Sequence, residues 1–119
     1  MGRVRIAVAT RNAKGLDDEI SDAFGRSKKI TIIDADQEKV AQIKVIDNPA
    51  LSFRFGAGPI LVKELLDMGV DIVVGSEFGP GAGQLLKDHG VLTVTLKPGT
   101  KVSAAIDTAL RHYAETEKA

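Results

Sequence analysis

The chain has 119 residues, enough for one domain with a hydrophobic core, and 44% of them are hydrophobic. Sixteen basic residues balance sixteen acidic ones, so no overall field draws the protein toward nucleic acid or a membrane. The absence of cysteine excludes disulfides, thiolate-bound metal centres and thiol nucleophiles. The first residues run into a strand pattern without the apolar stretch of a signal peptide or membrane helix, so we expect a cytoplasmic protein.

Three strand patterns occupy the first half of the chain. The apolar run at 4–9, broken only by Arg5, predicts a central strand. Two β-branched runs at 28–33 and 40–46, joined by a polar connection, predict an antiparallel pair. The charged, glycine-containing segment 10–27 is expected to be a loop.

A pattern that occurs twice organises the second half. Gly-Pro, a leucine and Gly-Val recur 21 residues apart, at 58–70 and 79–91. Proline in the first turn and glycine just past the last turn are typical of a helix, so each copy predicts a loop, a short helix and a strand. The two strands are expected at 71–74 and 91–96.

The predicted helices carry apolar stripes that should face a core. In the first helix, Leu61, Leu65 and Met68 share one face. In the last helix the stripe consists of Val102, Ile106, Ala109, Leu110 and Tyr113. Thr100 is expected to cap that helix, and the chain is expected to fray from about residue 115.

The order β-β-β-α-β-α-β-α predicts one α/β domain over residues 1–119, with a mixed five-stranded sheet flanked by helices. The strands at 4–9, 71–74 and 91–96 should be mutually parallel. Loops at the carboxyl ends of parallel strands line the ligand crevice in such sheets. Here these loops are rich in glycine and open onto helix N-termini, where unpaired N–H groups favour a bound anion.

Several motifs together resemble the dinitrogenase iron–molybdenum cofactor biosynthesis family. The segment 20–26, which ends in Phe24-Gly25-Arg26, resembles the family signature Ser-x-His-Phe-Gly-Arg, and the glycines and leucines from 56 to 91 resemble the rest of the domain. The resemblance implies a ribonuclease H-like fold and the binding or carriage of a sulfide cluster containing molybdenum or iron. It also implies a cluster-donor or acceptor protein as partner. In cysteine-free members the cluster is a molybdenum–copper sulfide held without covalent attachment.

One departure from the signature bears on the chemistry. Ala23 stands where the family usually has histidine, so direct metal ligation is not expected there. His89 and His112 are expected near helix C-termini, at the pole opposite the loops, in solvated or capping roles.

A cluster that brings its own sulfides can still be held as a complete anion. Backbone N–H groups, cationic side chains and an apolar wall would suffice, with no protein–metal bond. The residues that we expect to bind it are Arg11, Asn12, Lys14, Phe24, Gly25, Arg26, Arg54, Phe55, Gly56, Ala57, Gly75, Ser76 and Gly79.

Other interpretations of these residues stay open. The glycines could serve turn geometry alone, and Phe24 and Phe55 could be core residues that anchor their loops. Arg26 and Arg54 could be solvated surface charges. The segment 17–19 most resembles a solvated acidic loop, which argues against an anion directly over it.

An enzyme is the main alternative class. A ribonuclease H-like nuclease needs grouped carboxylates for Mg²⁺, usually with one on the first strand, and residues 4–9 contain none. The chain also lacks the P-loop motif, the dinucleotide-binding glycine motif after a strand, and a recognisable catalytic triad. The loop from Gly75 to Gly83 would suit phosphate equally well, so a phosphate- or nucleotide-binding protein or small enzyme remains the alternative. We favour a non-enzymatic binding or carrier protein.

Overall fold

The computed structural model describes residues 3–36 and 39–118. These residues form β1 (Val4–Thr10), the 3-10 turn η1 (Gly15–Asp17), β2 (Lys29–Asp36), β3 (Lys39–Asp47), α1 (Ala57–Asp67), β4 (Ile72–Gly75), α2 (Gly79–Asp88), β5 (Leu92–Thr95) and α3 (Val102–Lys118). The predicted order β-β-β-α-β-α-β-α is confirmed, and η1 is the one addition. The ends of the predicted domain, residues 1, 2 and 119, lie outside the described residues.

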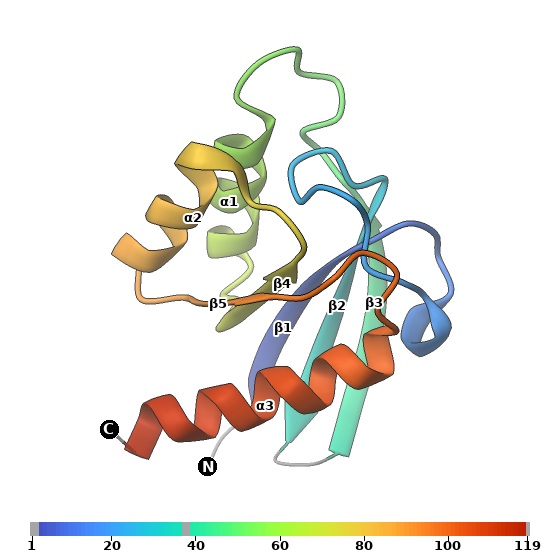
Figure 1. Ribbon diagram of the computed structural model, residues 1–119, viewed down its shortest axis with the longest axis vertical. Coiled ribbons are helices and arrows are strands. Elements are labelled where there is room, and N and C mark those ends of the chain that lie inside the picture. Colours follow the sequence, from blue (N-terminus) through green and yellow to red (C-terminus); the bar gives the residue numbers. More distant parts are fainter. Residues whose placement is uncertain (1–2, 37–38, 119) are drawn as a thin grey trace.

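The five strands form one mixed sheet in the order β3-β2-β1-β4-β5 (Figure 1). β1 is parallel to β4, and β4 is parallel to β5, as predicted from the repeat. β2 is antiparallel to both β1 and β3, so the predicted hairpin extends the same sheet. The carboxyl ends of β1 and β4 therefore meet at one edge of the sheet.

Helices cover both faces of the sheet (Figure 1). On one face, Leu61 and Leu65 of α1 and Leu86 of α2 are fully buried in one cluster with the side chains of Ala7 and Val73. On the other face α3 packs against the neighbouring strand residues, among them Ile6, Val8 and Val74. Because side chains alternate between the two faces along β1, this strand contributes residues to two separate hydrophobic cores. The apolar stripes predicted for the first and last helices are confirmed.

The helix ends differ in part from the prediction. α1 begins two residues before Pro59 and α2 one residue before Pro80. Thr100 does not cap α3, because its hydroxyl donates to the Lys97 carbonyl (2.7 Å) while the first helical N–H, that of Val102, donates to the Asp18 carbonyl (2.9 Å). α3 ends at Lys118, and the expected fraying from about residue 115 stays a prediction.

An ion pair links β1 and β2 at the end of the sheet opposite the carboxyl ends of β1 and β4. The Arg5 guanidinium lies 2.8 Å from the Asp34 carboxylate across β1 and β2, and it also donates to the Met68 carbonyl. The hydrogen bond from Arg5 lowers the pKa of Asp34 below its ordinary value.

In the described part of the chain, no helix has the length and apolar character needed to cross a membrane.

The positive φ of Gly69 gives a test of the helix stop. Gly69 has φ 71° and nothing lies within 4 Å of an added Cβ, so Gly69→Ala should lower the free energy of unfolding by about 1–2 kcal/mol through backbone strain alone. Gly83 lies inside α2 with ordinary space for a Cβ. Gly83→Ala should therefore raise the free energy of unfolding by about 0.5–1 kcal/mol. Urea unfolding of both variants tests this, and equal shifts of the same sign would contradict it.

The Arg5–Asp34 pair predicts a specific acid sensitivity. Because the folded-state pKa of Asp34 is lowered, its contribution to stability is full above the unfolded pKa of about 3.9 and is lost as the pH falls through the folded value. In Asp34→Asn that contribution is absent, so the free energy of unfolding should fall less between pH 5 and about pH 2 than in the wild type. Arg5→Met should flatten the profile in the same way. Unchanged acid sensitivity in both variants would be incompatible with the role given to this pair.

Candidate functional site

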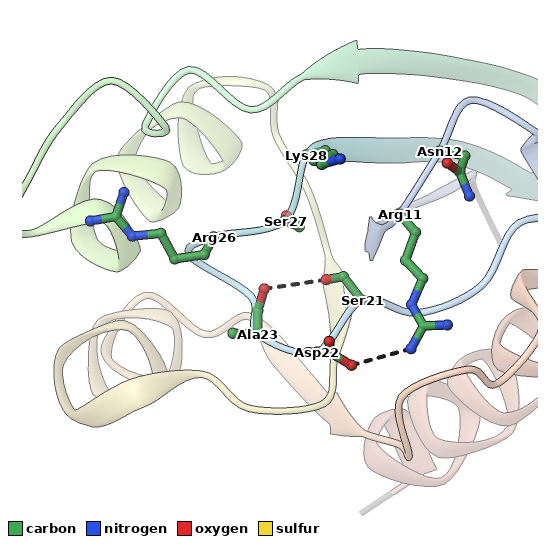
Figure 2. Close-up of a pocket in the computed structure, with 8 residues that line it drawn as sticks. All are labelled: Arg11, Asn12, Ser21, Asp22, Ala23, Arg26, Ser27 and Lys28. Carbon is green, nitrogen blue, oxygen red and sulfur yellow. Dashed lines mark hydrogen bonds and ion pairs between the residues drawn. The ribbon is translucent and has the colours of Figure 1, made fainter.

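Two adjoining clefts lie at the sheet edge where β1 and β4 end. The basic cleft has a volume of about 490 Å³ and is lined by Arg11, Asn12, Ser21, Asp22, Ala23, Arg26, Ser27 and Lys28 (Figure 2). The glycine cleft has a volume of about 220 Å³ and is lined by Ala23, Gly25, Arg26, Ala57, Gly58, Glu77, Phe78 and Gly79. Ala23 and Arg26 line both, so the segment that matches the family signature is the wall between them.

Three cationic side chains and one carboxylate line the basic cleft. The Arg11 guanidinium pairs with Glu19 (2.9 Å) and with the Asp22 carboxylate (3.2 Å), the second pair being drawn in Figure 2. The Lys28 side chain is exposed and has no ion pair among the described residues. The cleft therefore carries an excess of positive charge in a chain with no net charge.

Arg26 connects the clefts to the loop that precedes α1. Its side chain extends away from Arg11 and Ser21 (Figure 2). Its guanidinium donates to the Arg54 carbonyl (2.9 Å) and, over a longer distance, to the Leu51 carbonyl (3.4 Å). Neither acceptor is charged, so in the part of the chain that the structure describes Arg26 keeps an uncompensated positive charge.

The amino ends of α1 and α2 meet at the glycine cleft. Neither helix has a side-chain cap, and the first α1 bond is donated by Ile60, so the N–H groups of Ala57 and Gly58 are not used within the helix. Helix N-termini of this kind carry partial positive charge and free donors. Glu77 adds one carboxylate to the lining of the same cleft.

The wall between the clefts packs directly against the backbone of the first turn of α1. A Cβ on Gly25 would lie 2.9 Å from the Gly58 nitrogen, closer than real Cβ contacts allow, so this approach requires glycine. The Phe24 N–H donates to the Glu77 carbonyl (2.8 Å), which ties the wall to the loop after β4. The Ser76 hydroxyl lies 2.7 Å from the carbonyl oxygens of Ser21 and Asp22 and ties the preceding residues to the same loop.

Asn48 holds the wall to the loop before α1. Its side-chain amide is buried, donates to the carbonyls of Gly25 (3.0 Å) and Ser27 (2.9 Å), and accepts from the Ala50 N–H (2.9 Å). One side chain thus satisfies three backbone groups from two segments. Asn48 was not among the predicted site residues, although Asn-Pro is a known turn signal.

The structure brings together six of the residues predicted for the site. Arg11, Asn12 and Arg26 line the basic cleft, while Gly25, Ala57 and Gly79, again with Arg26, line the glycine cleft. Those that line neither cleft are Lys14, Phe24, Arg54, Phe55, Gly56, Gly75 and Ser76. Lining residues that were not among the predicted site residues include Lys28, which was expected in a strand, and Gly58, Glu77 and Phe78, which lie in the predicted glycine-rich loops.

Two of these residues are buried. Phe24 is 1% exposed and packs on Phe78 with ring centroids 5.1 Å apart, so it is the core anchor that was one of its two interpretations. Gly75 is buried beneath the same two rings. Both residues are buried beside the clefts and line neither of them.

The first loop is organised by a buried acidic residue. Asp18 is 1% exposed, and its carboxylate accepts backbone N–H groups from Asn12, Lys14 and Glu19 at 2.8–3.2 Å. The expectation of a solvated carboxylate was therefore wrong for Asp18. The N–H groups of Asn12 and Lys14 are already occupied, so this loop contributes side chains to the basic cleft but no backbone donors from these two residues.

Neither histidine lines the clefts. His89 is the C-cap of α2, with its Nδ1 2.9 Å from the Leu85 carbonyl oxygen, as expected for a residue at a helix C-terminus. His112 lies within α3 rather than near its end, so that part of the expectation was wrong. Across residues 3–36 and 39–118, no group of three or more histidine or acidic side chains is placed to hold a metal ion.

Comparison with known proteins agrees with the fold and the signature. The family described as Dinitrogenase iron-molybdenum cofactor matches residues 2–112. The apo form of the orange protein from Desulfovibrio gigas superimposes with a TM-score of 0.80 at 27% identity, covering 91% of this chain and 88% of that one. TM1290 from Thermotoga, described as a member of the DUF35 family, gives a TM-score of 0.68 at 30% identity, covering 88% and 85%.

A sequence relative is known from Methanocaldococcus jannaschii. The uncharacterized protein MJ0580 is 25% identical over 75 residues, which is 63% of this chain. The match spans 64% of the relative's own length.

The position of Asn48 predicts a test of how the clefts are held. Asn48→Ala removes partners from three backbone groups and should lower the free energy of unfolding by about 1–3 kcal/mol. Asn12→Ala is the matched control, since the Asn12 side chain is exposed and only its backbone is held. That variant should stay within about 0.5 kcal/mol of the wild type. Equal unfolding midpoints in urea for the two variants would show that Asn48 is not a structural link.

Proposed function

The chain belongs to the dinitrogenase iron–molybdenum cofactor family, and on that premise we propose that it is a non-enzymatic binding or carrier protein for an anionic metal-sulfide cluster. The cargo in this proposal contains molybdenum with copper or iron. The observation that carries it is the charge of the basic cleft, where Arg11 is paired with Glu19 and Asp22 but the lining residues Arg26 and Lys28 have no ion pair among the described residues, and where no histidine is present.

The cluster would arrive with its own sulfides as metal ligands. Protein groups then need only to bind the outer sulfur atoms, which are large, soft and weakly hydrated. A guanidinium group suits such an anion better than an ammonium group does, because it is itself weakly hydrated and presents several donors in a plane. Arg26 supplies such a group without an ion pair among the described residues, Arg11 supplies a second one that is paired with Glu19 and Asp22, and Lys28 adds a point charge.

The glycine cleft would complete the site with backbone donors. The N–H groups of Ala57 and Gly58 and the amino end of α2 at Gly79 favour negative charge. Ala23 lines both clefts at the position where the family signature usually has histidine. Its methyl group supplies a small apolar wall and no metal ligand, which favours retention by charge and hydrogen bonds.

Each cleft also contains one carboxylate, Asp22 or Glu77, which opposes an anion. Such partial compensation keeps binding reversible, as a carrier needs. We place the protein in the cytoplasm and propose a cluster-donor or acceptor protein as its partner.

Phosphate or nucleotide binding is the second candidate, favoured by the two uncapped helix N-termini at the glycine cleft. Gly75, the first residue of the predicted phosphate loop, is buried, whereas Glu77 opposes phosphate and a metal sulfide alike. The metal-sulfide proposal is preferred because of the family to which the chain belongs.

Tetrathiomolybdate is a suitable probe, since it is a soluble anionic metal sulfide with visible absorption. We expect the purified protein to bind it in equilibrium dialysis, more weakly as salt rises, because charges near the surface are screened over about 8 Å at physiological ionic strength. Molybdate has the same charge and shape with oxygen in place of sulfur and should bind more weakly. Phosphate and ATP serve as competitors for the second candidate.

Variants separate charge from metal ligation. Arg26→Ala and Lys28→Ala should each weaken tetrathiomolybdate binding by about 1.5–3 kcal/mol, the range for hydrogen bonds to charged groups, and Arg26→Lys should recover only part of the loss. Arg111→Ala on α3 is the matched control and should have no effect, as should His89→Ala and His112→Ala. The proposal would be overturned if binding did not change with salt or in Arg26→Ala and Lys28→Ala but was lost in a histidine variant. Displacement of tetrathiomolybdate by phosphate or ATP would favour the second candidate.

A further inference from the structure

The loop that leads into α1 displays an unusual amount of apolar surface. The described residues include five large hydrophobic side chains classed as exposed, and three of them lie here: Leu51 (40% exposed), Phe53 (48%) and Phe55 (83%). We call residues 51–55 the aromatic loop. Exposed aromatic side chains gathered in one place are typical of surfaces that bind another molecule.

The aromatic loop is held in shape from within the protein. Ala50 is fully buried beside it, and Asn48 fixes the Ala50 N–H. The Phe53 N–H donates to the Ala50 carbonyl (3.1 Å), while Arg26 donates to the carbonyls of Leu51 and Arg54. The backbone is thus tied down while the apolar side chains face outward, so their exposure is a built feature and not the result of a slack segment.

The charges within the segment that carries the aromatic loop have one sign. The sequence contains no acidic residue from 48 to 63, and Arg54, within the loop, makes no ion pair among the described residues. Arg26, which is also without an ion pair there, lies directly behind it. A complementary surface would therefore offer an apolar recess for the two phenylalanines with carboxylates around it.

The aromatic loop also adjoins the clefts. It continues through Gly56 into Ala57 and Gly58, which line the glycine cleft, and it shares Arg26 with both clefts. From this arrangement we infer that the aromatic loop is the docking surface for a partner protein with a carboxylate-rimmed apolar recess, and that this partner exchanges the cargo. The exchange rests on the proposed function, whereas the docking does not.

Photo-crosslinking in the native host identifies the occupant of the loop. A photoreactive phenylalanine, p-benzoyl-L-phenylalanine, replaces Phe53, and the same group at the exposed position of His112 on α3 is the control. We expect a product with a second protein at position 53 that is absent at position 112. The same product at both positions, or only a covalent dimer of this chain, would overturn the inference.

The captured protein is then purified and its affinity measured against matched variants. Arg54→Glu and the pair Phe53→Ser with Phe55→Ser should each weaken binding by at least about tenfold, as expected at the centre of an interface. Arg111→Glu controls for charge reversal, and Val40→Ser with Ile43→Ser controls for the loss of exposed apolar side chains on β3. Unchanged affinity in the loop variants, or an equal loss in the controls, would contradict the docking surface.

Tetrathiomolybdate binding by the same variants separates this inference from the proposed function. The side chains of Phe53 and Phe55 line neither cleft and carry no charge, so the pair Phe53→Ser with Phe55→Ser should bind tetrathiomolybdate as the wild type does. If no variant and no wild-type protein binds tetrathiomolybdate while docking depends on the aromatic loop, the docking surface stands and the cargo proposal fails. If tetrathiomolybdate binds but the loop variants dock as the wild type does, the cargo proposal stands and the docking surface fails.

Discussion

The close approach of Gly25 to the amino end of α1 is the contact on which the site depends. A side chain at this position would collide with the backbone of Gly58, so the segment around Gly25 can lie between the helix and the end of β4 only because it has none. Ser76 holds this segment from the β4 side and Asn48 from the loop before α1. The arrangement places Ala23 and Arg26 where both clefts share them.

Local electrostatics distinguish this site in a chain whose charges balance overall. Acidic side chains pair with Arg11, but Arg26 and Lys28 have no ion pair among the described residues, and two helices begin at the adjoining cleft without a cap. No histidine lines either cleft. Taken with the family to which the chain belongs, this combination favours the retention of a whole anion over coordination of a bare metal ion.

Features set by short-range sequence were predictable. The twice-repeated Gly-Pro and Gly-Val pattern predicted α1, α2 and the parallel strands after them, because proline and glycine act on their own backbone. Features that depend on distant partners were not. Asp18 was expected to be solvated, but its carboxylate accepts backbone N–H groups from residues across its loop, which only the folded loop brings together. Phe24 and Phe55 both precede glycine, yet one is buried against Phe78 and the other is 83% exposed.

The central claim is that the cargo metal keeps its sulfide ligands and gains none from the protein. X-ray absorption at the molybdenum edge of protein loaded with tetrathiomolybdate tests this most directly, since it reports the atoms bonded to the metal. The account predicts a first shell of sulfur alone, unchanged in His89→Ala and His112→Ala. A nitrogen or oxygen atom bonded to molybdenum, lost when a histidine or carboxylate is replaced, would contradict it.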